Sequence, residues 1–383
     1  MPHTPPVGND LRTGQPDSDR NQGGHDGSDV VGGERRTTVA SMTATMRDIA
    51  EATGVSQSTV SRVLSGTRTT VPIAEATRKR VMESARRLGY RPNPLARGLR
   101  GAPTMLIGVI VRDITDPFFA GAIEAASLEA NERGYNVVLG HAHRSADEAQ
   151  ALASILEARH CDALLFLGDL RDRPGLSEEL RDCRLPVVAL WHGSGDSGIP
   201  TVSVDNDAGI GAVIDHLVSL GHESIAFAGP RRLGDIAERE EAYRHSLARH
   251  GLAYHDACCQ DCGNDFTGGA DVFVRLMKRD PCPTAIIAAT DVIAIGMLCA
   301  AHEQGLTVPD DVSIVGFDDI PVAQVTIPKL TTVRMPTGAM TVAAMNLLIG
   351  SRDGQQLHEH PVLAPELVVR ASTGATSAGR RLD

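Results

Sequence analysis

Aromatic residues and long apolar runs are both scarce in this chain of 383 residues. Aromatic residues make up only 3%, although hydrophobic residues make up 42%, which is enough for full-sized cores and excludes wholesale disorder. No apolar run reaches the roughly 18 residues that a membrane-spanning helix needs. The polar N-terminus also lacks the apolar core of a secretory signal. We therefore expect a cytoplasmic protein without a membrane partner.

Basic residues are outnumbered as well, and the formal net charge is −11. Taken alone, this value argues against nucleic acid as a partner. The distribution of charge argues the opposite. Residues 46–100 hold eleven basic and four acidic residues, a net charge of +7, whereas residues 101–383 hold 22 basic and 38 acidic residues, a net charge of −16. A basic module attached to an acidic body is typical of a nucleic-acid-binding protein with a second role.

The seven cysteines are odd in number, and none lies in the basic module. Reduced, mostly buried thiols are the favoured interpretation. The alternative is a metal site formed by His255, Cys258, Cys259 and Cys262. One short cluster without a second pair of ligands is weak evidence for such a site, so we expect no metal and no cofactor.

The two ends of the chain are polar. Residues 1–44 are rich in Gly, Asp, Ser, Thr and Pro and have almost no apolar periodicity, which predicts a disordered tail. Residues 374–383 are again small and polar and predict a frayed end. Met42 and Met46 stand just before the first ordered segment, so the true start of the protein stays open.

Helical patterns begin abruptly at Thr45, which forms a predicted capping box with Asp48. Ser56 is placed to cap a second helix, and Gly89 to end a third. The apolar spacing places the helices at residues 46–52, 57–64 and 73–88, the last with Val81, Ala85 and Leu88 facing inward. The pattern predicts an all-α helix-turn-helix headpiece over residues 45–90.

In a helix-turn-helix unit, the second helix points its N-terminal turns at base edges in the major groove. Gln57 and Ser58 are candidates to pair with bases, and Arg62 suits the O6 and N7 atoms of guanine. We expect phosphate contacts from residues at and near the N-terminus of this helix, namely Ser56, Thr59 and Ser61. The alternative is a polar helical hairpin that packs on the body.

Residues 103–373 alternate short apolar runs with amphipathic stretches. The runs cover residues 105–111, 137–139, 163–167, 187–190, 225–228, 284–289 and 312–317, and the helical patterns cover 118–133, 208–220, 238–250 and 292–303. This alternation predicts an α/β body of two doubly wound lobes, each with a parallel sheet.

Ligands of such open sheets bind at the carboxyl ends of the strands. Four of the twelve aromatic residues stand at predicted strand ends, together with several acidic residues. The candidates are Asp116, Phe118, Phe119, Trp191, His192, Thr290, Asp291, Phe317 and Asp318. Aromatic faces beside acidic hydrogen-bond acceptors favour a polyhydroxylated ligand such as a sugar.

The headpiece sequence resembles that of the lactose/galactose-repressor (LacI/GalR) family. The motif is MRDIAEATGVSQSTVSRVL at residues 46–64, and LGYRPNPLARGL at residues 88–99 resembles the family's hinge. We expect a hinge helix within residues 91–102. Because this helix is too short to be stable alone, it should fold only against a second copy of the chain and DNA. The resemblance implies that Leu99, helped by Ala96, wedges into the minor groove, with Asn93 capping the hinge helix.

The body also resembles the family's effector domain, which is similar to periplasmic sugar-binding proteins. The shared motifs include DPFF at residues 116–119 and VGFDD at residues 315–319. The resemblance implies that Arg239 and Asp318 bond ligand hydroxyls while Phe118 and Trp191 stack on the ligand. Two departures from the family pattern leave the identity of the ligand undecided among a sugar, a nucleobase and a protein. The family commonly has Asn-Asp where Thr290-Asp291 stands, and sugar binders often have Asn at the position of Asp116.

Together these patterns predict an effector-controlled transcriptional regulator, a repressor, that binds a pseudo-palindromic double-stranded DNA operator as a homodimer or as a tetramer. A solute-binding protein would need an export signal and no headpiece. An enzyme would need a catalytic constellation, and the sequence contains no nucleophile elbow or phosphate loop. Whether the effector induces or corepresses is left open.

Overall fold

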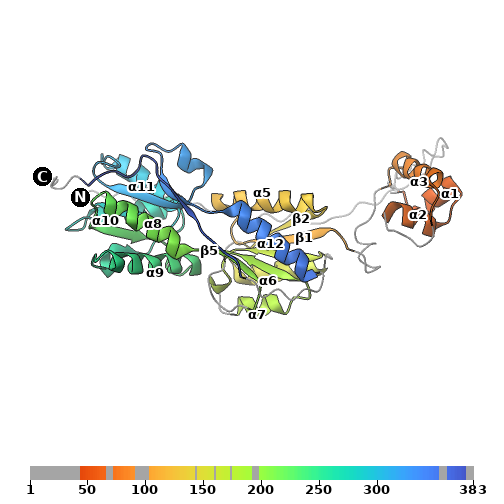
Figure 1. Cartoon of the computed structure of the whole chain (residues 1–383), viewed down its shortest axis with the longest axis horizontal. Helices are drawn as coiled ribbons and strands as arrows, with labels where there is room; N and C mark the ends of the chain where they lie inside the picture. Colours follow the sequence, from red (N-terminus) through yellow and green to blue (C-terminus); the bar gives the residue numbers. More distant parts are fainter. Residues whose placement is uncertain are drawn as a thin grey trace, which may run out of the picture. The chain divides into compact units, whose positions relative to one another are not determined.

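The computed structural model describes residues 44–65, 72–90, 103–142, 145–158, 161–172, 175–191, 198–352 and 360–376. The chain divides into two compact units, Met1–Pro92 and Asn93–Asp383. Each unit has its own hydrophobic core, and Figure 1 labels the helices and strands of both.

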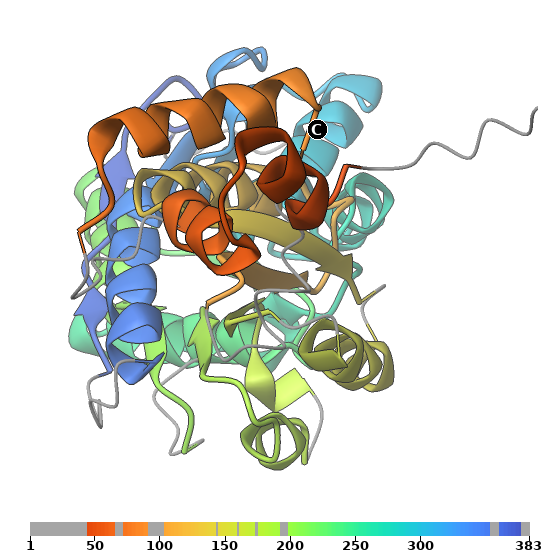
Figure 2. The same ribbon diagram turned by 90° about the vertical axis from the view of Figure 1, so that its right-hand side faces the viewer.

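The first unit contains three helices, α1 (Met46–Thr53), α2 (Gln57–Ser65) and α3 (Glu75–Arg87), which pack around one another (Figure 2). The capping box of Thr45 and Asp48 is present at the start of α1. The α1–α2 turn uses Gly54 at a φ of 66°, a conformation that glycine adopts without steric cost. The hydroxyl of Ser56 accepts a hydrogen bond from the Thr59 amide at 3.2 Å and so caps α2.

The small core of the headpiece contains the apolar residues that the helical spacing predicted. Its buried members are Ile49, Val60, Val63, Val81 and Ala85. The prediction for Leu88 was wrong, because α3 ends at Arg87 and the Leu88 side chain is 37% exposed. The chain reverses at Gly89, and Tyr90 packs against the core instead.

The first lobe of the body has a six-stranded sheet in the order β11-β5-β4-β3-β1-β2. Its strands are β1 (Leu106–Val111), β2 (Asn136–His141), β3 (Ala163–Leu167), β4 (Val187–Leu190), β5 (Thr201–Val204) and β11 (Val362–Leu363). Its helical segments are α5 (Pro117–Glu132), α6 (Ala146–Ala158), η1 (Leu170–Asp172), α7 (Leu176–Arg181) and α12 (Thr337–Arg352). Alternate residues of β3 belong to different apolar clusters, Leu165 to one and Leu164 to the other, so both faces of the sheet are covered.

The second lobe has a six-stranded sheet in the order β12-β10-β9-β8-β6-β7. Its strands are β6 (Ile225–Ala228), β7 (Cys259–Gln260), β8 (Ala285–Ala288), β9 (Ser313–Asp318), β10 (Thr331–Arg334) and β12 (Glu366–Val368). Its helical segments are α8 (Asn206–Ser219), α9 (Gly234–Arg249), η2 (Asp256–Cys258), α10 (Phe266–Met277), α11 (Asp291–Glu303) and η3 (Pro321–Gln324). Helix α8 packs on α9, and α10 packs on α11.

Within the described residues, the chain crosses between the lobes after β5, after β10 and after β11. The predicted two-lobed α/β architecture is therefore confirmed, with one addition. All strand pairs are parallel except that of β10 with β12, which is antiparallel. These crossings bring the carboxyl ends of the strands of the two sheets to face each other across a cleft. Ligands of open α/β sheets bind at such strand ends.

Helices α10 and α11 approach so closely that their backbones touch. A Cβ atom on Gly269 would overlap the carbonyl oxygen of Ile293, and one on Gly296 would overlap that of Phe266. Neither carbonyl can move aside, because each belongs to the backbone of the opposite helix or its first turn. The two glycines therefore set the distance between these helices.

We predict that Gly269→Ala lowers the free energy of unfolding by about 1–3 kcal/mol, because the added methyl group must push α10 from α11. Gly121→Ala in α5 is the control, since its Cβ would meet nothing within 4 Å. This control should be neutral or stabilising by up to about 1 kcal/mol. Urea unfolding of both variants makes the comparison, and equal stabilities would contradict it.

Two histidines, the buried His222 and the half-buried His216, hold the segment after β12 against the second lobe. The Nε2 atom of His222 lies 3.0 Å from the Gly374 carbonyl oxygen, to which it donates, and the Nε2 atom of His216 lies 3.0 Å from the Thr373 hydroxyl. The Thr376 amide also donates to the Leu220 carbonyl. These bonds order residues that we expected to belong partly to a frayed end. Burial lowers the pKa of both histidines.

We predict that the protein loses stability as the pH falls below about 6.5, the ordinary pKa of histidine. The unfolded chain takes up protons there more readily than the folded one, whose histidine pKa values are lowered. His222→Gln removes one of these groups. Its stability deficit relative to the wild type should shrink between about pH 7.5 and about pH 5.5 in urea unfolding, whereas a constant deficit would contradict the assignment.

Candidate nucleic-acid interface and ligand cleft

Helix α2 presents one polar side to solvent. The side chains of Gln57, Ser58 and Arg62 are exposed, whereas Val60 and Val63 of the same helix are buried in the headpiece core. A helix whose apolar side is held by its own unit leaves the polar side available for a partner. The candidates for base contacts therefore lie together on one accessible surface.

The other residues expected at the DNA lie around the start of α2. The Ser56 hydroxyl lies 2.8 Å from that of Ser58 and 2.9 Å from that of Thr59. Ser61 follows, half-buried. Because the first amides of a helix lack intrahelical partners, this end suits an anionic phosphate. The hinge residues Asn93, Ala96 and Leu99 lie outside the described residues.

In the body, a cleft lies between the two lobes. Its wall on the first lobe is formed by Arg112, Asp116, Phe118, Phe119, Gly168, Asp169 and Trp191. Its wall on the second lobe is formed by Leu233, Asp235, Ile236, Arg239, Asn264, Thr290 and Asp318. Charged and aromatic side chains thus meet at the carboxyl ends of the sheets, as the sequence predicted.

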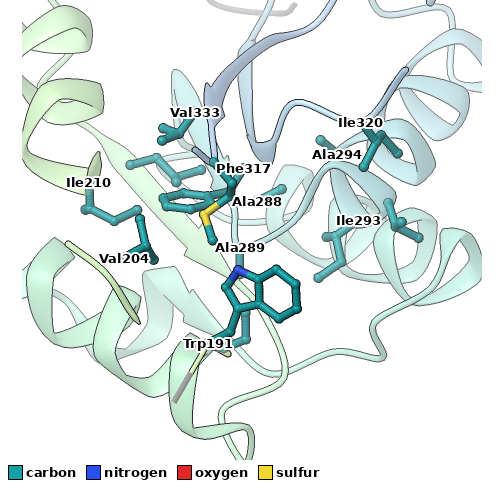
Figure 3. Close-up of a cluster of buried hydrophobic side chains, with 14 of the residues drawn as sticks. Trp191, Val204, Ile210, Ala288, Ala289, Ile293, Ala294, Phe317, Ile320 and Val333 are labelled. Atoms are coloured by element: carbon teal, nitrogen blue, oxygen red, sulfur yellow. The ribbon is translucent and has the colours of Figure 1, made fainter. Parts of the chain in front are cut away.

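Three aromatic rings form the apolar part of the cleft. The centroids of Phe118 and Trp191 lie 4.9 Å apart at an interplanar angle of 67°, and Phe119 contacts both in similar edge-to-face geometry. Trp191 follows β4 with a φ of 68°, a conformation that is costly for a bulky residue. Among the described residues, its buried indole nitrogen has no hydrogen-bond partner, and it faces the side of Ala289 and Phe317 (Figure 3).

Arg239 is the central cation of the second wall and is only 2% exposed. Its Nη1 atom donates to the Ala289 carbonyl at 2.6 Å, and its Nε atom donates to the Asn206 side-chain oxygen at 3.1 Å. The guanidinium carbon lies 3.7 Å from the centroid of the Phe317 ring. This stacking and these bonds hold the guanidinium in one orientation toward the cleft.

Asp318 faces Arg239, with 3.7 Å between its carboxylate oxygen and Nη1. Burial raises the pKa of Asp318, which the nearby Arg239 opposes. Both Asp318 and Asp319 have positive φ values, 118° and 55°, so the end of β9 is strained. Strain at the end of a cleft-facing strand is typical of a binding site.

A hydrogen-bonded chain crosses the cleft opposite Arg239. The Thr290 hydroxyl donates to the Asn264 oxygen at 2.8 Å, and the Asn264 nitrogen donates to Asp116 at 3.0 Å. Asp116 also caps α5 by accepting from the Phe118 amide. Burial raises the pKa of Asp116. Asp116 and Thr290 therefore lie where the sequence placed them, joined by an asparagine that sequence reasoning missed.

Two predicted ligand residues do not line the cleft. Asp291 is fully buried, accepts hydrogen bonds from the Ile320 amide and the Thr332 hydroxyl, and so ties α11 to the loop after β9 and to β10. Phe317 is also fully buried and supports Arg239 from behind. Both stand at strand ends but point into the lobe. His192 lies outside the described residues.

Of the cleft residues absent from the sequence-based set, four carry charged or amide side chains: Arg112, Asp169, Asp235 and Asn264. Arg112 and Asp169 follow β1 and β3 within two residues, so the strand-end rule could have found them. Asp235 and Asn264 lie at or before helix starts, where no sequence signal separated them from ordinary capping residues.

The cysteines of the alternative metal cluster lie at the apolar core of the second lobe. Cys259 belongs to the apolar core, Cys258 and Cys262 pack against it, and burial raises the pKa of Cys259 and Cys262 to about 12. Within the described part of the chain, no three His, Cys, Asp or Glu side chains form a group that could hold a metal ion. None of the described helices is long and apolar enough to cross a membrane.

Comparison with protein families matches residues 45–93 to "Bacterial regulatory proteins, lacI family" and residues 214–373 to "Periplasmic binding protein-like domain". Among curated proteins, the chain is 33% identical over 334 residues to the HTH-type transcriptional repressor CytR of Escherichia coli, covering 87% of this chain and 97% of that protein. It is 32% identical over 310 residues to catabolite control protein A of Priestia megaterium, covering 80% of this chain and 92% of that protein.

Among solved structures, the chain is similar to a lac repressor dimer bound to operator and the anti-inducer ONPF. The TM-score is 0.77 at 27% identity, covering 87% of this chain and 99% of that chain. It is also similar to the complex of the transcriptional regulator CelR with cellobiose, with a TM-score of 0.65 at 29% identity, covering 86% of this chain and 99% of that chain. The chain belongs to the lacI family of bacterial regulatory proteins.

Proposed function

We propose that this protein is a transcriptional repressor that binds operator DNA through its headpiece and a small-molecule effector through the cleft of its body. One observation carries the proposal: a self-contained helical headpiece exposes a polar recognition helix, and a separate two-lobed body holds a charged, aromatic cleft. A solute-binding protein would have no use for the first unit. The relatives reported above are transcriptional regulators rather than enzymes, and a regulator of this kind acts in the cytoplasm, where the chromosome lies.

At the DNA, Gln57, Ser58 and Arg62 contact base edges, and the hydroxyl groups around the start of α2 contact phosphates. The hinge residues Asn93, Ala96 and Leu99 extend the contact into the minor groove. A headpiece with one short recognition helix reads only a half-site, so a pseudo-palindromic operator requires two copies of the chain. The net charge of +7 on residues 46–100 supports this role.

In the cleft, Asp116, Asp318 and Arg239 bond ligand hydroxyls while Phe118 and Trp191 pack on the apolar face of the ligand. Carboxylates accept and a guanidinium donates, and a polyol needs both. The unpartnered Trp191 nitrogen adds a donor inside the aromatic part of the cleft. A sugar or a nucleoside fits this chemistry, and cellobiose is the ligand of one similar structure. Closure of the lobes on the ligand then changes how two hinges meet.

We predict that Arg62→Ala weakens binding to the preferred operator by about 1–3 kcal/mol and relaxes base preference at one position. A sequence selected from a random duplex pool serves as the probe, titrated at several salt concentrations. Arg80→Ala, an exposed residue of α3 with the same change of charge, is the control and should keep the base preference. Wild-type affinity that is insensitive to salt, or unchanged base preference in Arg62→Ala, would refute the DNA-binding assignment.

We predict that a thermal-shift screen of sugars and nucleosides finds a stabilising ligand, and that Arg239→Ala weakens its binding about tenfold or more. Asp318→Asn removes the carboxylate that faces Arg239 with little change of shape. It replaces Arg239→Ala in the test if Arg239→Ala folds poorly. The control is Arg249→Ala on the same helix, whose side chain is 54% exposed. A ligand that binds all the variants equally would contradict the cleft assignment.

A further inference from the structure

Beside the cleft, an ion pair joins the two lobes in addition to the pair of Arg112 with Asp235, whose atoms lie 3.8 Å apart in the cleft walls. The Nη1 atom of Arg171, in η1 of the first lobe, lies 2.7 Å from the Oε1 atom of Glu238, in α9 of the second. Neither side chain lines the cleft. The Arg171 side chain is 34% exposed and that of Glu238 is 25% exposed, so solvent screens this pair only in part.

Arg171 is held rigidly on its own lobe. Its Nε and Nη2 atoms donate to Asp169 at 3.0 and 2.6 Å, and its backbone amide donates to the same carboxylate at 2.7 Å. Asp169 is itself 1% exposed and lines the cleft. A guanidinium bound in this way spans a carboxylate with one edge and keeps one Nη1 proton aimed at Glu238.

On the second lobe, the contact continues to the cleft. The other oxygen of Glu238 accepts from the Asn206 nitrogen at 2.9 Å, and the Asn206 oxygen accepts from the Arg239 Nε atom at 3.1 Å. An arginine can only donate and an ionised carboxylate can only accept, so the two neighbours of Asn206 fix the orientation of its amide. The donations therefore converge on Glu238, from Arg239 through Asn206 on the second lobe and from Arg171 on the first.

We propose that Arg171, Glu238 and Asn206 are positioning residues that hold the lobes closed before an effector binds and that orient Arg239 for the effector. The proposal rests on the proposed effector role of the cleft. When the lobes separate, Glu238 loses Arg171 but keeps its bond to Asn206, because both residues lie in the second lobe. The contacts that hold the lobes closed therefore also favour the binding of an effector at Arg239.

Trp191 is a built-in reporter of this closure, because it is the chain's only tryptophan. It is 5% exposed and lies in the wall of the first lobe, with Ala289 and Phe317 of the second lobe nearby (Figure 3). Opening of the lobes exposes its indole to water. Its fluorescence then shifts to the red and becomes accessible to acrylamide, a neutral quencher. The measurement needs neither an effector nor an operator.

The test compares Glu238→Gln and Arg171→Ala with Glu241→Gln, all in the full chain without ligand. Glu241 lies one turn further along α9, its side chain is 56% exposed, and its substitution makes the same change of charge. The loss of a charge-assisted bond should shift the closed-to-open ratio about tenfold in the first two variants, raising the acrylamide quenching constant. Glu241→Gln should match the wild type. The double variant Arg171→Ala/Glu238→Gln should exceed neither single variant, since both remove one contact.

Two further variants separate positioning from general loss of structure. Arg171→Lys keeps the charge but loses the fork to Asp169, so its quenching should lie between those of the wild type and Arg171→Ala. Asn206→Asp places a carboxylate against Glu238 and should open the cleft, whereas Asp207→Asn next to it should not. Quenching of Glu238→Gln and Arg171→Ala equal to that of Glu241→Gln would overturn the proposal. That result would leave DNA binding untouched, whereas absence of DNA binding by the wild type would refute only the proposed function.

Discussion

A buried guanidinium organises the body of this protein. Removing a cation from water is costly unless its donors are satisfied, and Arg239 is only 2% exposed. Its partners come from separate elements: Asn206 from the start of α8, the Ala289 carbonyl from the end of β8, and the Phe317 ring and Asp318 from β9. The hydrogen bonds and contacts of the Arg239 guanidinium therefore bring together the ends of β8 and β9 and the crossing between the lobes after β5. The cleft is the open side of that arrangement.

The same constraint explains the acidity around the cleft. Burial raises the pKa of Asp116, Asp291 and Asp318, so these carboxyl groups are held where ionisation is unfavourable. Asp291 is satisfied internally, whereas Asp116 and Asp318 face the cleft. Groups of this kind gain most from a ligand that donates hydrogen bonds. The body carries a net charge of −16 over residues 101–383, which repels the DNA backbone and leaves contact with DNA to the basic headpiece.

The parts of the fold that sequence predicts best are those in which local pattern and burial agree. The predicted runs at residues 163–167, 187–190 and 225–228 coincide with β3, β4 and β6, because strands covered on both faces are continuously apolar. Strands β5 and β10 were missed because threonine and serine interrupt their apolar character, although Thr201, Thr331 and Thr332 are buried by the lobes around them. The turn at residues 54–56 was predictable because capping chemistry is local.

For the site, strand ends located the cleft but did not assign each side chain. Asp318 ends β9 and Asp291 follows β8 closely, yet the first faces the cleft and the second accepts a hydrogen bond from the Ile320 amide. That difference depends on which way the chain turns after β8 and β9, which no residue spacing encodes. The link from Arg171 to Glu238 joins residues 67 positions apart on different lobes, and it depends on lobe closure.

The central claim is that one protein couples DNA binding by the headpiece to ligand binding in the cleft. The most direct measurement is the affinity of the full chain for its selected operator, by fluorescence anisotropy, with and without a saturating cleft ligand. The account predicts a change of about 5–150-fold in operator affinity, and an equal change in ligand affinity when DNA is bound. Operator affinity that is the same with and without ligand would contradict it.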